Sequence, residues 1–432
     1  MFIARSMGPC ARVRSLCAPL LFLLAIPGCS NPVPENPAES LTYWRTLTGA
    51  SGEAQDELID QYNATAPGVH VTSEFQGSYS DLATKLLTAL AGRTGPEVSQ
   101  LGTFEIRQFA KSGALVDLKP YVTGQNGLDL SGWPGSLTEA GAVGNGIYWL
   151  PFNVAVPVLY FNKDAFSEAG LAESPATWDT FFEAARRLTK RDAAGNVERC
   201  GVAFWNITWP LFSMIWSEGG ELTTRDYTNI TLDDPVVVRL LTQIQALVRE
   251  GCATLPDKAS GGHRAAFLNG RAAMILDSQD AFGEVFERAL PFSPGVANYP
   301  AGSKGKVYAP GGGGLVMLAA APDTKRDAAW AFMRYMLEPK QIAYYAKRTG
   351  YLAFTTEAQE NAKEMLQDSR YRIIHDALPY VRGDFSVNMS PAVRNAFDTA
   401  FHKIMLENAD VESTLRAADA QAEQDIKKEL TP

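Results

Sequence analysis

The chain has few of the residues from which metal and catalytic centres are usually built. Its four histidines are scattered, and none stands in a metal-ligand spacing such as His-x-x-x-His. No Gly-x-Ser-x-Gly elbow and no Walker loop occurs, and the run Gly311–Gly314 lacks the Lys-Ser/Thr that a phosphate loop needs. We therefore expect no catalytic residues, no metal and no cofactor, and we interpret the glycine run as a close backbone approach or a hinge.

Positive charge and long apolar runs are also scarce. The 48 acidic residues outnumber the 39 basic ones, which gives a formal net charge of −9. Nucleic-acid binding needs a basic face, so we expect no nucleic-acid partner. Beyond residue 30 no run approaches the roughly 18 consecutive apolar residues of a membrane span. The 432 residues are too many for one ordinary domain and favour two or three.

The first 29 residues have the composition of a secretory leader. Arg5, Arg12 and Arg14 precede an apolar run over 16–27, and no acidic residue occurs among the 29. We therefore predict a signal peptide over 1–29. Its removal takes away three arginines and no acid, which moves the formal charge from −9 to −12.

The leader ends in Ile26-Pro27-Gly28-Cys29, which resembles a bacterial lipobox. The resemblance implies that Cys29 carries a lipid that anchors the chain to the membrane, on its periplasmic or other extracytoplasmic side. The Pro-, Asn-, Glu- and Ser-rich segment over 30–40 suits a flexible tether. The alternative is a plain signal peptide with Cys29 near its cleavage site by chance.

Five cysteines are present, and two of them would remain as thiols after the signal peptide is removed and Cys29 is lipidated. Cys10 and Cys17 are removed with the signal peptide, and Cys29 is the lipidated residue. Cys200 and Cys252 remain in what would be an oxidising compartment. They either form a disulfide or stay as two buried thiols.

Strand-like and helix-like segments alternate from residue 41 onward. β-prone runs at 42–44, 70–72 and 96–101 are separated by amphipathic helical segments, one over 53–63 and one that Ser80 is expected to cap. This alternation predicts an α/β fold with mostly parallel sheets flanked by helices. In such folds ligands bind where the loops converge at the carboxyl ends of the strands.

A long apolar segment over 147–161 contains two prolines and is better explained as a crossover between two lobes than as one strand. We interpret 291–300 and 309–317 as return crossings. The predicted first lobe comprises 41–153 plus 291–338, and the predicted second lobe comprises 154–290 plus 339–432.

Aromatic residues near the expected loop ends are the strongest chemical signal. A flat ring covers the apolar face of a sugar or polyol while nearby polar groups bind its hydroxyls. The alternative for each of them is a place in the core. The residues are Trp44, Tyr79, Trp205, Trp209, Trp216 and Tyr351.

Several motifs resemble the extracellular solute-binding proteins of the carbohydrate-uptake ABC transporter family, in that family's order. They are the segments Tyr160–Phe166, Pro175–Trp178, Ala266–Met274, Ala329–Phe332 and Thr349–Leu352. The resemblance covers nearly all of the mature chain. It implies a two-lobed, type II periplasmic-binding-protein-like fold, joined by crossover hinge segments, that closes on a ligand.

Within that family the chain is similar to the group that binds glycerol-3-phosphate and glycerophosphodiesters. Gly77-Ser78-Tyr79 resembles that group's Gly-Asn-Tyr, and Asn388-Met389 matches a short element near its C-terminus. The ligand-binding residues expected from the resemblance and the aromatic pattern are Trp44, Tyr79, Glu105, Asn153, Trp205, Trp209, Ser278, Gly312, Gly313 and Tyr351.

Two departures from the group's pattern concern the phosphate. Val154 and Ala155 stand where the group has serines, and Phe385 stands where it has a phosphate-binding arginine. Losing that guanidinium removes charge-assisted hydrogen bonds, each worth about 1.5–3 kcal/mol. Arg45 or Arg382 could supply a replacement cation.

We therefore expect a monomeric solute-binding component of an ABC importer, and not an enzyme. Its partners would be a small ligand and a permease heterodimer. The ligand is either a glycerophosphate or related polyol, as the motifs indicate, or a neutral mono- or oligosaccharide, as the departures indicate. A secreted glycan-active enzyme is a third hypothesis, and it would need an essential acid that the sequence does not single out.

Overall fold

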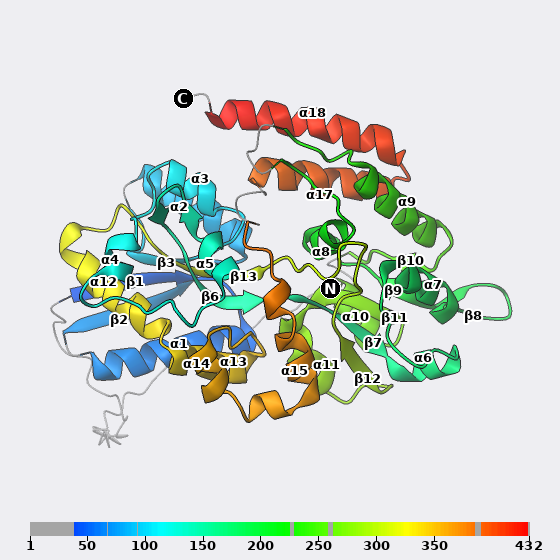
Figure 1. The fold of residues 1–432 in the computed structure, drawn as a ribbon, viewed down its shortest axis with the longest axis horizontal. Coiled ribbons are helices and arrows are strands. Elements are labelled where there is room, and N and C mark those ends of the chain that lie inside the picture. Colours follow the sequence, from blue (N-terminus) through cyan, green and yellow to red (C-terminus); the bar gives the residue numbers. More distant parts are fainter. Residues whose placement is uncertain are drawn as a thin grey trace, which may run out of the picture. The chain divides into compact units, whose positions relative to one another are not determined.

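Two β-sheets, each covered by helices, organise the chain (Figure 1). The computed structural model describes residues 39–66, 68–92, 94–224, 229–257, 262–384 and 390–430. These residues belong to one compact unit, 38–432. The predicted lipidation site Cys29, and with it Phe385, Asn388 and Met389, lies outside the described residues.

The first sheet has five strands in the order β2-β1-β3-β13-β6. Strand β1 pairs in parallel with β2 and with β3, whereas β13 is antiparallel to both β3 and β6. Four strands therefore run one way and β13 alone runs the other. The bounds are β1 Glu39–Arg45, β2 Val69–Phe75, β3 Val98–Gly102, β6 Leu150–Ala155 and β13 Gly311–Met317.

The second sheet repeats this plan in the order β10-β9-β11-β7-β12, with β8 beside β9. Strands β10, β9 and β11 are parallel, and β7 is antiparallel to both β11 and β12. The bounds are β7 Pro157–Asn162, β8 Lys190–Arg191, β9 Val197–Ala203, β10 Ala253–Thr254, β11 Ala272–Ser278 and β12 Pro294–Ala297. A separate hairpin joins β4 Ala142–Val143 to β5 Gly146–Ile147.

The reversed strand of each sheet is the strand that arrives from the other sheet. The chain leaves β6 in the first sheet and enters β7 in the second after a single residue, Val156. It returns from β12 to β13. The first crossing carries almost continuous apolar sequence because the six residues of β6 and five of the six in β7 are buried. The predicted crossover over 147–161 is thus confirmed.

Helices flank both sheets and account for most of the remaining chain (Figure 1). Helices α1, α2, α5, α12 and α13 pack on the first sheet, and α7, α8, α9, α10 and α15 pack on the second. The bounds are α1 Gly49–Thr65, α2 Tyr79–Ala91, α3 Ile106–Lys111, α4 Lys119–Thr123, α5 Gly135–Ala140, α6 Lys163–Glu168, α7 Trp178–Leu188, α8 Trp209–Ser217, α9 Pro235–Arg249, α10 Gly262–Leu268, α11 Phe282–Phe286, α12 Asp323–Met336, α13 Pro339–Thr349, α14 Thr356–Asn361, α15 Ser369–His375, α17 Pro391–Leu406 and α18 Val411–Leu430. Short 3₁₀ turns are η1 Gln279–Ala281, η2 Met365–Gln367 and η3 Leu378–Tyr380.

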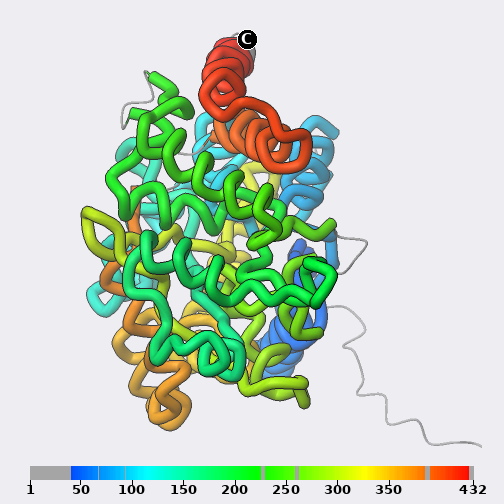
Figure 2. Tube along the Cα trace, turned by 90° about the vertical axis from the view of Figure 1, so that its right-hand side faces the viewer, coloured from blue at the N-terminus to red at the C-terminus, as the bar shows by residue number. Residues whose placement is uncertain are grey.

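The C-terminal helices form a separate layer. Helix α18 lies along α17 in both views, and α17 and α18 both contact α9 (Figures 1 and 2). Among the described residues, no helix combines the length and the apolar character that crossing a membrane would need.

Three details differ from the sequence-based expectations. Residues 294–297, predicted in the first lobe, pair along β7 as a strand of the second sheet. Helix α13, predicted with the second lobe, packs on β6 and α1 because its buried face, including Ile342 and Tyr345, completes the first core. Helix α2 is capped by Ser78 rather than Ser80. Where the lobes hinge stays a prediction.

Candidate functional site

A chain of polar side chains runs through the first sheet to the hydroxyl of Tyr79. Asn153 Nδ2 donates to Tyr79 Oη at 2.8 Å, and Gln100 Nε2 donates to Asn153 Oδ1 at 3.1 Å. Gln100 Oε1 in turn accepts from the backbone N–H of Thr46 at 2.7 Å. Burial raises the pKa of Tyr79 to about 12, so its hydroxyl keeps its proton at neutral pH. The network therefore presents a fixed phenol.

Local sequence places Tyr79 at the start of α2. Gly77 has φ +102°, which favours glycine, and it turns the chain after β2. Ser78 and Asp81 then form a capping box that fixes the first turn of the helix. The Tyr79 ring lies against the backbone of β13, since a Cβ on Gly313 would come within 2.7 Å of Tyr79 Cε1. Gly313 is thus required for this contact.

The same glycine strand approaches the second sheet's aromatics. A Cβ on Gly311 would lie 2.4 Å from Trp209 Cζ2, and Trp209 Nε1 donates to Pro310 O at 3.1 Å. Gly312 has φ +81°, and a Cβ there would overlap the carbonyl oxygen of Asn153. The glycine run thus permits close backbone approach, one of the two roles that its composition suggested.

Glu105 sits in the turn after β3 and makes one bond to a distant helix. Its Oε1 accepts from Arg394 Nη1 of α17 at 3.1 Å, while no partner for Oε2 occurs among the described residues. Burial raises the pKa of Glu105, and the guanidinium of Arg394 opposes that rise. The Arg394 guanidinium also lies 4.7 Å from the centre of the Phe104 ring. One buried oxygen of the Glu105 carboxylate therefore has no hydrogen-bond donor among the described residues.

Two tryptophans lie where β9 leads into α8. Trp205 and Trp209 meet edge to face with ring centres 6.2 Å apart. Trp205 is half-buried and stacks on His263 at 4.9 Å. His263 Nε2 lies 2.9 Å from Asp277 Oδ2, which fixes the imidazole behind the indole. The arrangement offers a partly exposed, supported indole face.

Asp277 belongs to an ion cluster around Arg264. Arg264 donates to both oxygens of Asp277, at 2.6 and 3.0 Å, and also to Asp280 and Glu284. Burial alone would raise the pKa of Asp277, but the Arg264 guanidinium and the neighbouring His263 bring it well below its usual value. Asp277 is therefore ionised at any physiological pH, and both its oxygens are occupied.

Ser278 and Tyr351 complete the ring of predicted residues. Ser278 ends β11 and caps η1 by accepting from Asp280 N at 3.4 Å. Tyr351 follows the left-handed cap Gly350 of α13, and its ring centre lies 5.5 Å from that of Tyr345. Burial raises the pKa of Tyr351 well above its usual value. The Tyr351 hydroxyl therefore keeps its proton at neutral pH, and its ring packs beside that of Tyr345.

Six of the ten residues expected to bind a ligand are linked by these contacts, namely Tyr79, Asn153, Trp205, Trp209, Gly312 and Gly313. Trp44 lies apart. Its indole N–H donates to Glu74 Oε2 at 2.8 Å, and its ring packs on the cluster that contains Leu82 and Leu86. The six linked residues come from the loops after β2 and β9 and from the two crossings, as expected for carboxyl ends of strands.

Sequence reasoning missed several groups that the structure adds. Gln100 was detectable as a long polar side chain inside a short strand, and His263 and Arg264 lie just before the Ala266–Met274 motif. Arg394 gave no signal, because it meets Glu105 across 289 residues of sequence. Neither replacement cation considered from the sequence is unpaired. Arg45 binds Asp56, and Arg382 binds Glu221 and Asp384.

The disulfide that the sequence left open does not form: Cys200 and Cys252 are both free and buried. Strand register explains this, because Val202 pairs with Ala253. Cys200 then shares a face with Val202, whereas Cys252, one residue before Ala253, points to the opposite face. The alternative of two buried thiols is confirmed.

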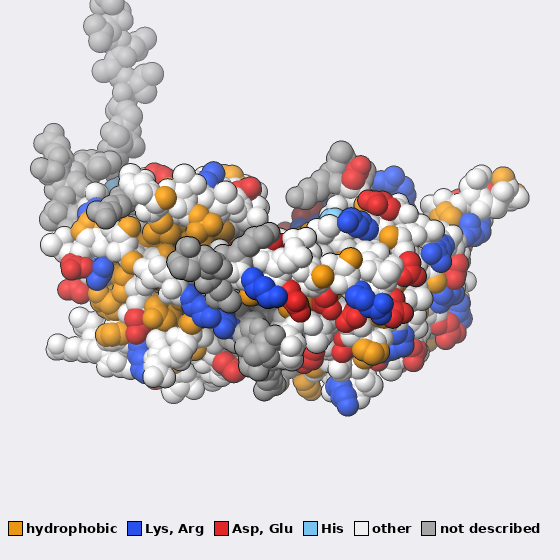
Figure 3. Space-filling view, turned by 90° about the horizontal axis from the view of Figure 1, so that it is seen from above, with side chains coloured by type: hydrophobic (Ala, Val, Ile, Leu, Met, Phe, Trp, Pro, Cys, Tyr) orange, Lys and Arg blue, Asp and Glu red, His pale blue; other side chains and the backbone are white. Residues whose placement is uncertain are grey.

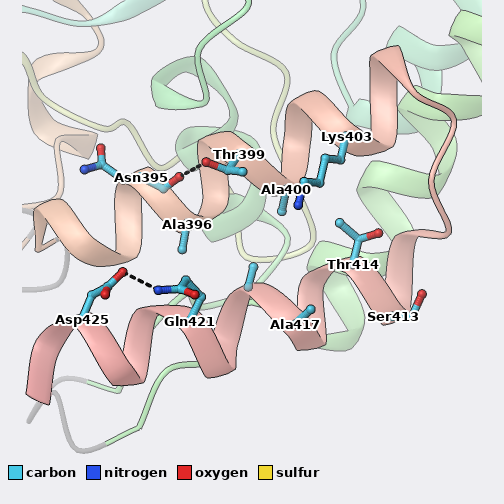
Figure 4. Close-up of a pocket in the computed structure, with 11 residues that line it drawn as sticks. Asn395, Ala396, Thr399, Ala400, Lys403, Ser413, Thr414, Ala417, Gln421 and Asp425 are labelled. Carbon is cyan, nitrogen blue, oxygen red and sulfur yellow. Dashed lines mark hydrogen bonds between the residues drawn. The ribbon is translucent and has the colours of Figure 1, made fainter.

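Two cavities differ in their relation to these residues. A cavity of 730 Å³ adjoins the site, with Ser51 at the start of α1 on one side and Asp280 and Gly350 on the other. A groove of 530 Å³ between α17 and α18 is lined by small and polar residues such as Ala396 and Gln421, and no predicted site residue lines it (Figure 4). On the face in Figure 3, acidic and basic side chains are interspersed on the described part rather than gathered by sign.

Comparisons with known proteins show the family to which the chain belongs. The family model of the bacterial extracellular solute-binding proteins matches residues 47–343. The sn-glycerol-3-phosphate-binding periplasmic protein UgpB of Brucella abortus is 25% identical over 340 residues, which cover 75% of this chain and 76% of that protein. UgpB of Yersinia pestis is 26% identical over 384 residues, covering 83% and 85%.

Solved structures share the fold. UgpB from Mycobacterium tuberculosis, in complex with glycerophosphocholine, aligns with a TM-score of 0.80 at 24% identity, over 91% of this chain and 99% of that one. An ABC substrate-binding protein from Listeria monocytogenes, in complex with cycloalternan, aligns with a TM-score of 0.78 at 22% identity, over 90% and 99%. At these identities the likeness concerns the fold alone.

The chain belongs to the bacterial extracellular solute-binding proteins, the components that capture solutes for ABC importers. Within that family it is similar to the UgpB proteins, so the resemblance seen in its motifs and the two-lobed α/β fold are both confirmed. Family membership also agrees with the expectation that the chain is not an enzyme.

Proposed function

We propose that this protein captures a small polyhydroxylated solute between its two sheets and delivers it to a heterodimeric ABC permease. The observation that carries the proposal is the convergence of Tyr79 and Glu105 from one side with Trp205 and Trp209 from the other. Tyr79 and Trp209 both lie against the glycine-rich start of β13, with Glu105 near Tyr79 and Trp205 beside Trp209.

The chemistry of these groups suits hydroxylated ligands. The half-buried Trp205 can cover the C–H face of a sugar or polyol, and the open oxygen of Glu105 can accept from a hydroxyl. The phenol of Tyr79 and the backbone at Gly312–Gly313 add polar groups at fixed positions. Similarity to the UgpB proteins favours a glycerophosphate or glycerophosphodiester as this ligand.

A neutral mono- or oligosaccharide is the second candidate, because both cations considered as replacements for the missing arginine are paired. Arg45 and Arg382 each bind carboxylates and are largely buried. A phosphate would therefore have to displace an existing ion pair, which costs more than binding to a free guanidinium.

Ligand would act by holding the two lobes together. Only the closed arrangement lets groups from both lobes touch one molecule, so the ligand stabilises that state by its additional contacts. The closed protein would then dock on the permease. We propose further that it does so as a monomer held at the membrane by a lipid on Cys29.

Thermal unfolding with tryptophan fluorescence tests the proposal. The protein without its leader, residues 30–432, contains the whole compact unit. It would be heated with glycerol-3-phosphate, glycerophosphocholine, maltose, trehalose or sorbitol. A ligand at a hundredfold excess over its Kd should add about 2.7 kcal/mol of stability. Trp205→Ala should abolish the ligand-induced rise in melting temperature. Phe354→Leu is the control and should leave that rise in place, because Phe354 packs on Trp133 and is not among the residues expected to bind the ligand.

Lipid attachment has its own test. Cells expressing the full chain would be labelled with a radioactive fatty acid, and the Cys29→Ala variant should lose the label. Label retained by that variant would contradict anchoring at this residue. Solute binding would be unaffected by either result.

A further inference from the structure

Four arginines near the crossings lie against acids. The pairs are Arg45 with Asp56; Arg264 with Asp277, Asp280 and Glu284; Arg382 with Glu221 and Asp384; and Arg394 with Glu105. Each of these four guanidiniums is therefore compensated by at least one carboxylate.

The pair of Glu105 and Arg394 differs from the others in its position and its geometry. Glu105 follows β3 of the first sheet and is 4% exposed. Arg394 lies on α17, which packs on α9 beside the second sheet, and its side chain is 19% exposed. Phe104, next to Glu105, contacts both Arg394 and Phe212 of α8. The ion pair thus bridges the two sides of the site.

The unoccupied oxygen of Glu105 faces the ligand-binding residues. Oε1 is bonded to Arg394, and Oε2 is buried without a described partner. A Cβ on Gly102 would lie 2.9 Å from Oε2 and 3.4 Å from Tyr79 Cδ1, which places this oxygen beside the Tyr79 ring. A buried acceptor without a donor is costly, so the position favours a ligand that donates a hydrogen bond.

We propose that Glu105 and Arg394 together determine specificity: because each neutralises the other across the two sides of the site, the pair favours an uncharged, hydroxyl-bearing ligand over a phosphate monoester. The inference rests on the proposed function, because it specifies the ligand of the same site. Arg394 uses one of its five N–H donors on Glu105 and can donate another to a ligand oxygen. Together the pair presents a donor and an acceptor with no net charge.

Charge balance explains why a phosphate monoester is rejected. A neutral polyol adds no charge beside Glu105, whereas a phosphate places at least one further negative charge close to a carboxylate that is already buried. The single guanidinium cannot fully compensate both anions. Removing the carboxylate charge should therefore reverse the preference.

Helix α17 links this pair to the tryptophans. Asp398, one turn after Arg394, accepts from the backbone N–H of Thr208 at 3.0 Å. His402, a further turn on, contacts Asn206 O at 2.7 Å. Residues spaced by four share one helical face, so the face that reaches Glu105 also holds the segment between Trp205 and Trp209. Ligand selection and the aromatic platform thus depend on one helix.

The test is a charge-reversal series measured by calorimetric titration with glycerol-3-phosphate. The wild type should bind it weakly or not at all. Glu105→Gln keeps the side-chain shape and frees Arg394, and should bind at least about tenfold more tightly. Glu105→Gln combined with Arg394→Gln should lose that gain. Circular dichroism and unfolding midpoints would establish that each variant is folded.

Glu168→Gln is the matched control, because it also removes a carboxylate from an arginine, Arg199, away from the site. It should not gain affinity for glycerol-3-phosphate. The proposal is overturned if the wild type binds glycerol-3-phosphate more tightly than sorbitol and maltose, if Glu105→Gln shows no gain, or if the double variant keeps the gain. Failure of the proposed function would appear differently: the wild type would then bind no solute of the panel. The affinities of the variants for glycerol-3-phosphate could still be compared with each other in that case.

Discussion

Two arginines, Arg264 and Arg394, bind buried carboxylates on either side of the same site, and they do so in different ways. Arg264 meets three acids, and both oxygens of Asp277 are occupied by donors. Arg394 meets Glu105 alone and leaves one oxygen open. A saturated cluster is part of the framework, whereas an unsaturated pair is stable only if something else completes it.

The electrostatics of the two acids differ in sign. The pKa of Asp277 is lowered because Arg264 and His263 outweigh its burial, whereas the pKa of Glu105 is raised because burial outweighs Arg394. Ionised Asp277 therefore stabilises the fold, and ionised Glu105 does not. Buried groups whose charge destabilises the fold, as that of Glu105 does, are common at binding sites, where function can cost stability.

The largest expected effect is the loss of stability in Asp277→Asn. The side chain of Asp277 is completely buried, and its removal leaves Arg264 and His263 without their shared anion. Breaking a buried pair by removing one partner costs about 3–5 kcal/mol. Urea unfolding would measure the change. Asp323→Asn is the control, because Asp323 is 86% exposed in its pair with Arg326 and should cost less than about 0.5 kcal/mol. Equal effects of the two variants would remove the distinction between framework and surface pairs.

The pH dependence of the same variant follows from the lowered pKa of Asp277. A carboxyl whose pKa is lower in the folded state contributes stability above its unfolded value, about 3.9, and loses it as the pH falls below that value. The difference between wild type and Asp277→Asn should thus be constant from pH 8 to 5 and shrink below about pH 4. Unfolding midpoints across this range would measure it, and a difference that grew on acidification would contradict the assignment.

The sequence predicted the fold better than it predicted which residues pair with the two buried acids. The alternation of strands and helices and the crossover over 147–161 are local patterns, and they led to the correct fold and to Tyr79. The partner of Glu105 could not be predicted, because Arg394 is 289 residues away and nothing near it distinguishes it from a surface arginine. Pairing across two lobes is decided by tertiary packing, and so is the docking of α13 on the first core.

A smaller effect, of opposite sign, is expected for the stability of Glu105→Gln. Since burial raises the pKa of Glu105, its charge is less stable in the folded state than in water at neutral pH. The neutral isostere should leave stability unchanged or raise it by up to about 1 kcal/mol at pH 7.5, although Arg394 loses its partner. The advantage should shrink towards pH 4, where the wild-type carboxyl gains its proton. A loss of several kcal/mol would mean that this pair is as structural as that of Asp277.

The smallest expected effect concerns a third arrangement, in which two carboxylates lie close together and only one exposed arginine is near them. Asp419 of α18 accepts from Leu232 N at 2.8 Å and also contacts Asp233. Burial and the Asp233 carboxyl raise the pKa of Asp419 to about 6, and Arg416, 65% exposed, lies 3.7 Å from Asp233. This third case extends the comparison to an acid whose charge opposes folding and whose position, on α18, lies outside the site.

Asp419→Asn keeps the acceptor for Leu232 N and removes the repulsion with Asp233. Because Asp419 is only half-buried, the gain in stability should stay below about 1 kcal/mol at pH 7.5, or about 1–2 °C in Tm. A carboxyl with a raised pKa destabilises until the unfolded state is protonated as well, so the gain should fall below pH 6 and nearly vanish at about pH 3.5, below the unfolded pKa of about 3.9. Glu423→Gln on the same helix, in an exposed pair with Lys427, should change nothing at either pH. A gain that persisted at about pH 3.5 would trace to helix propensity or packing rather than to charge, and the ratio of acids to cations would then not explain which carboxylates stabilise this fold.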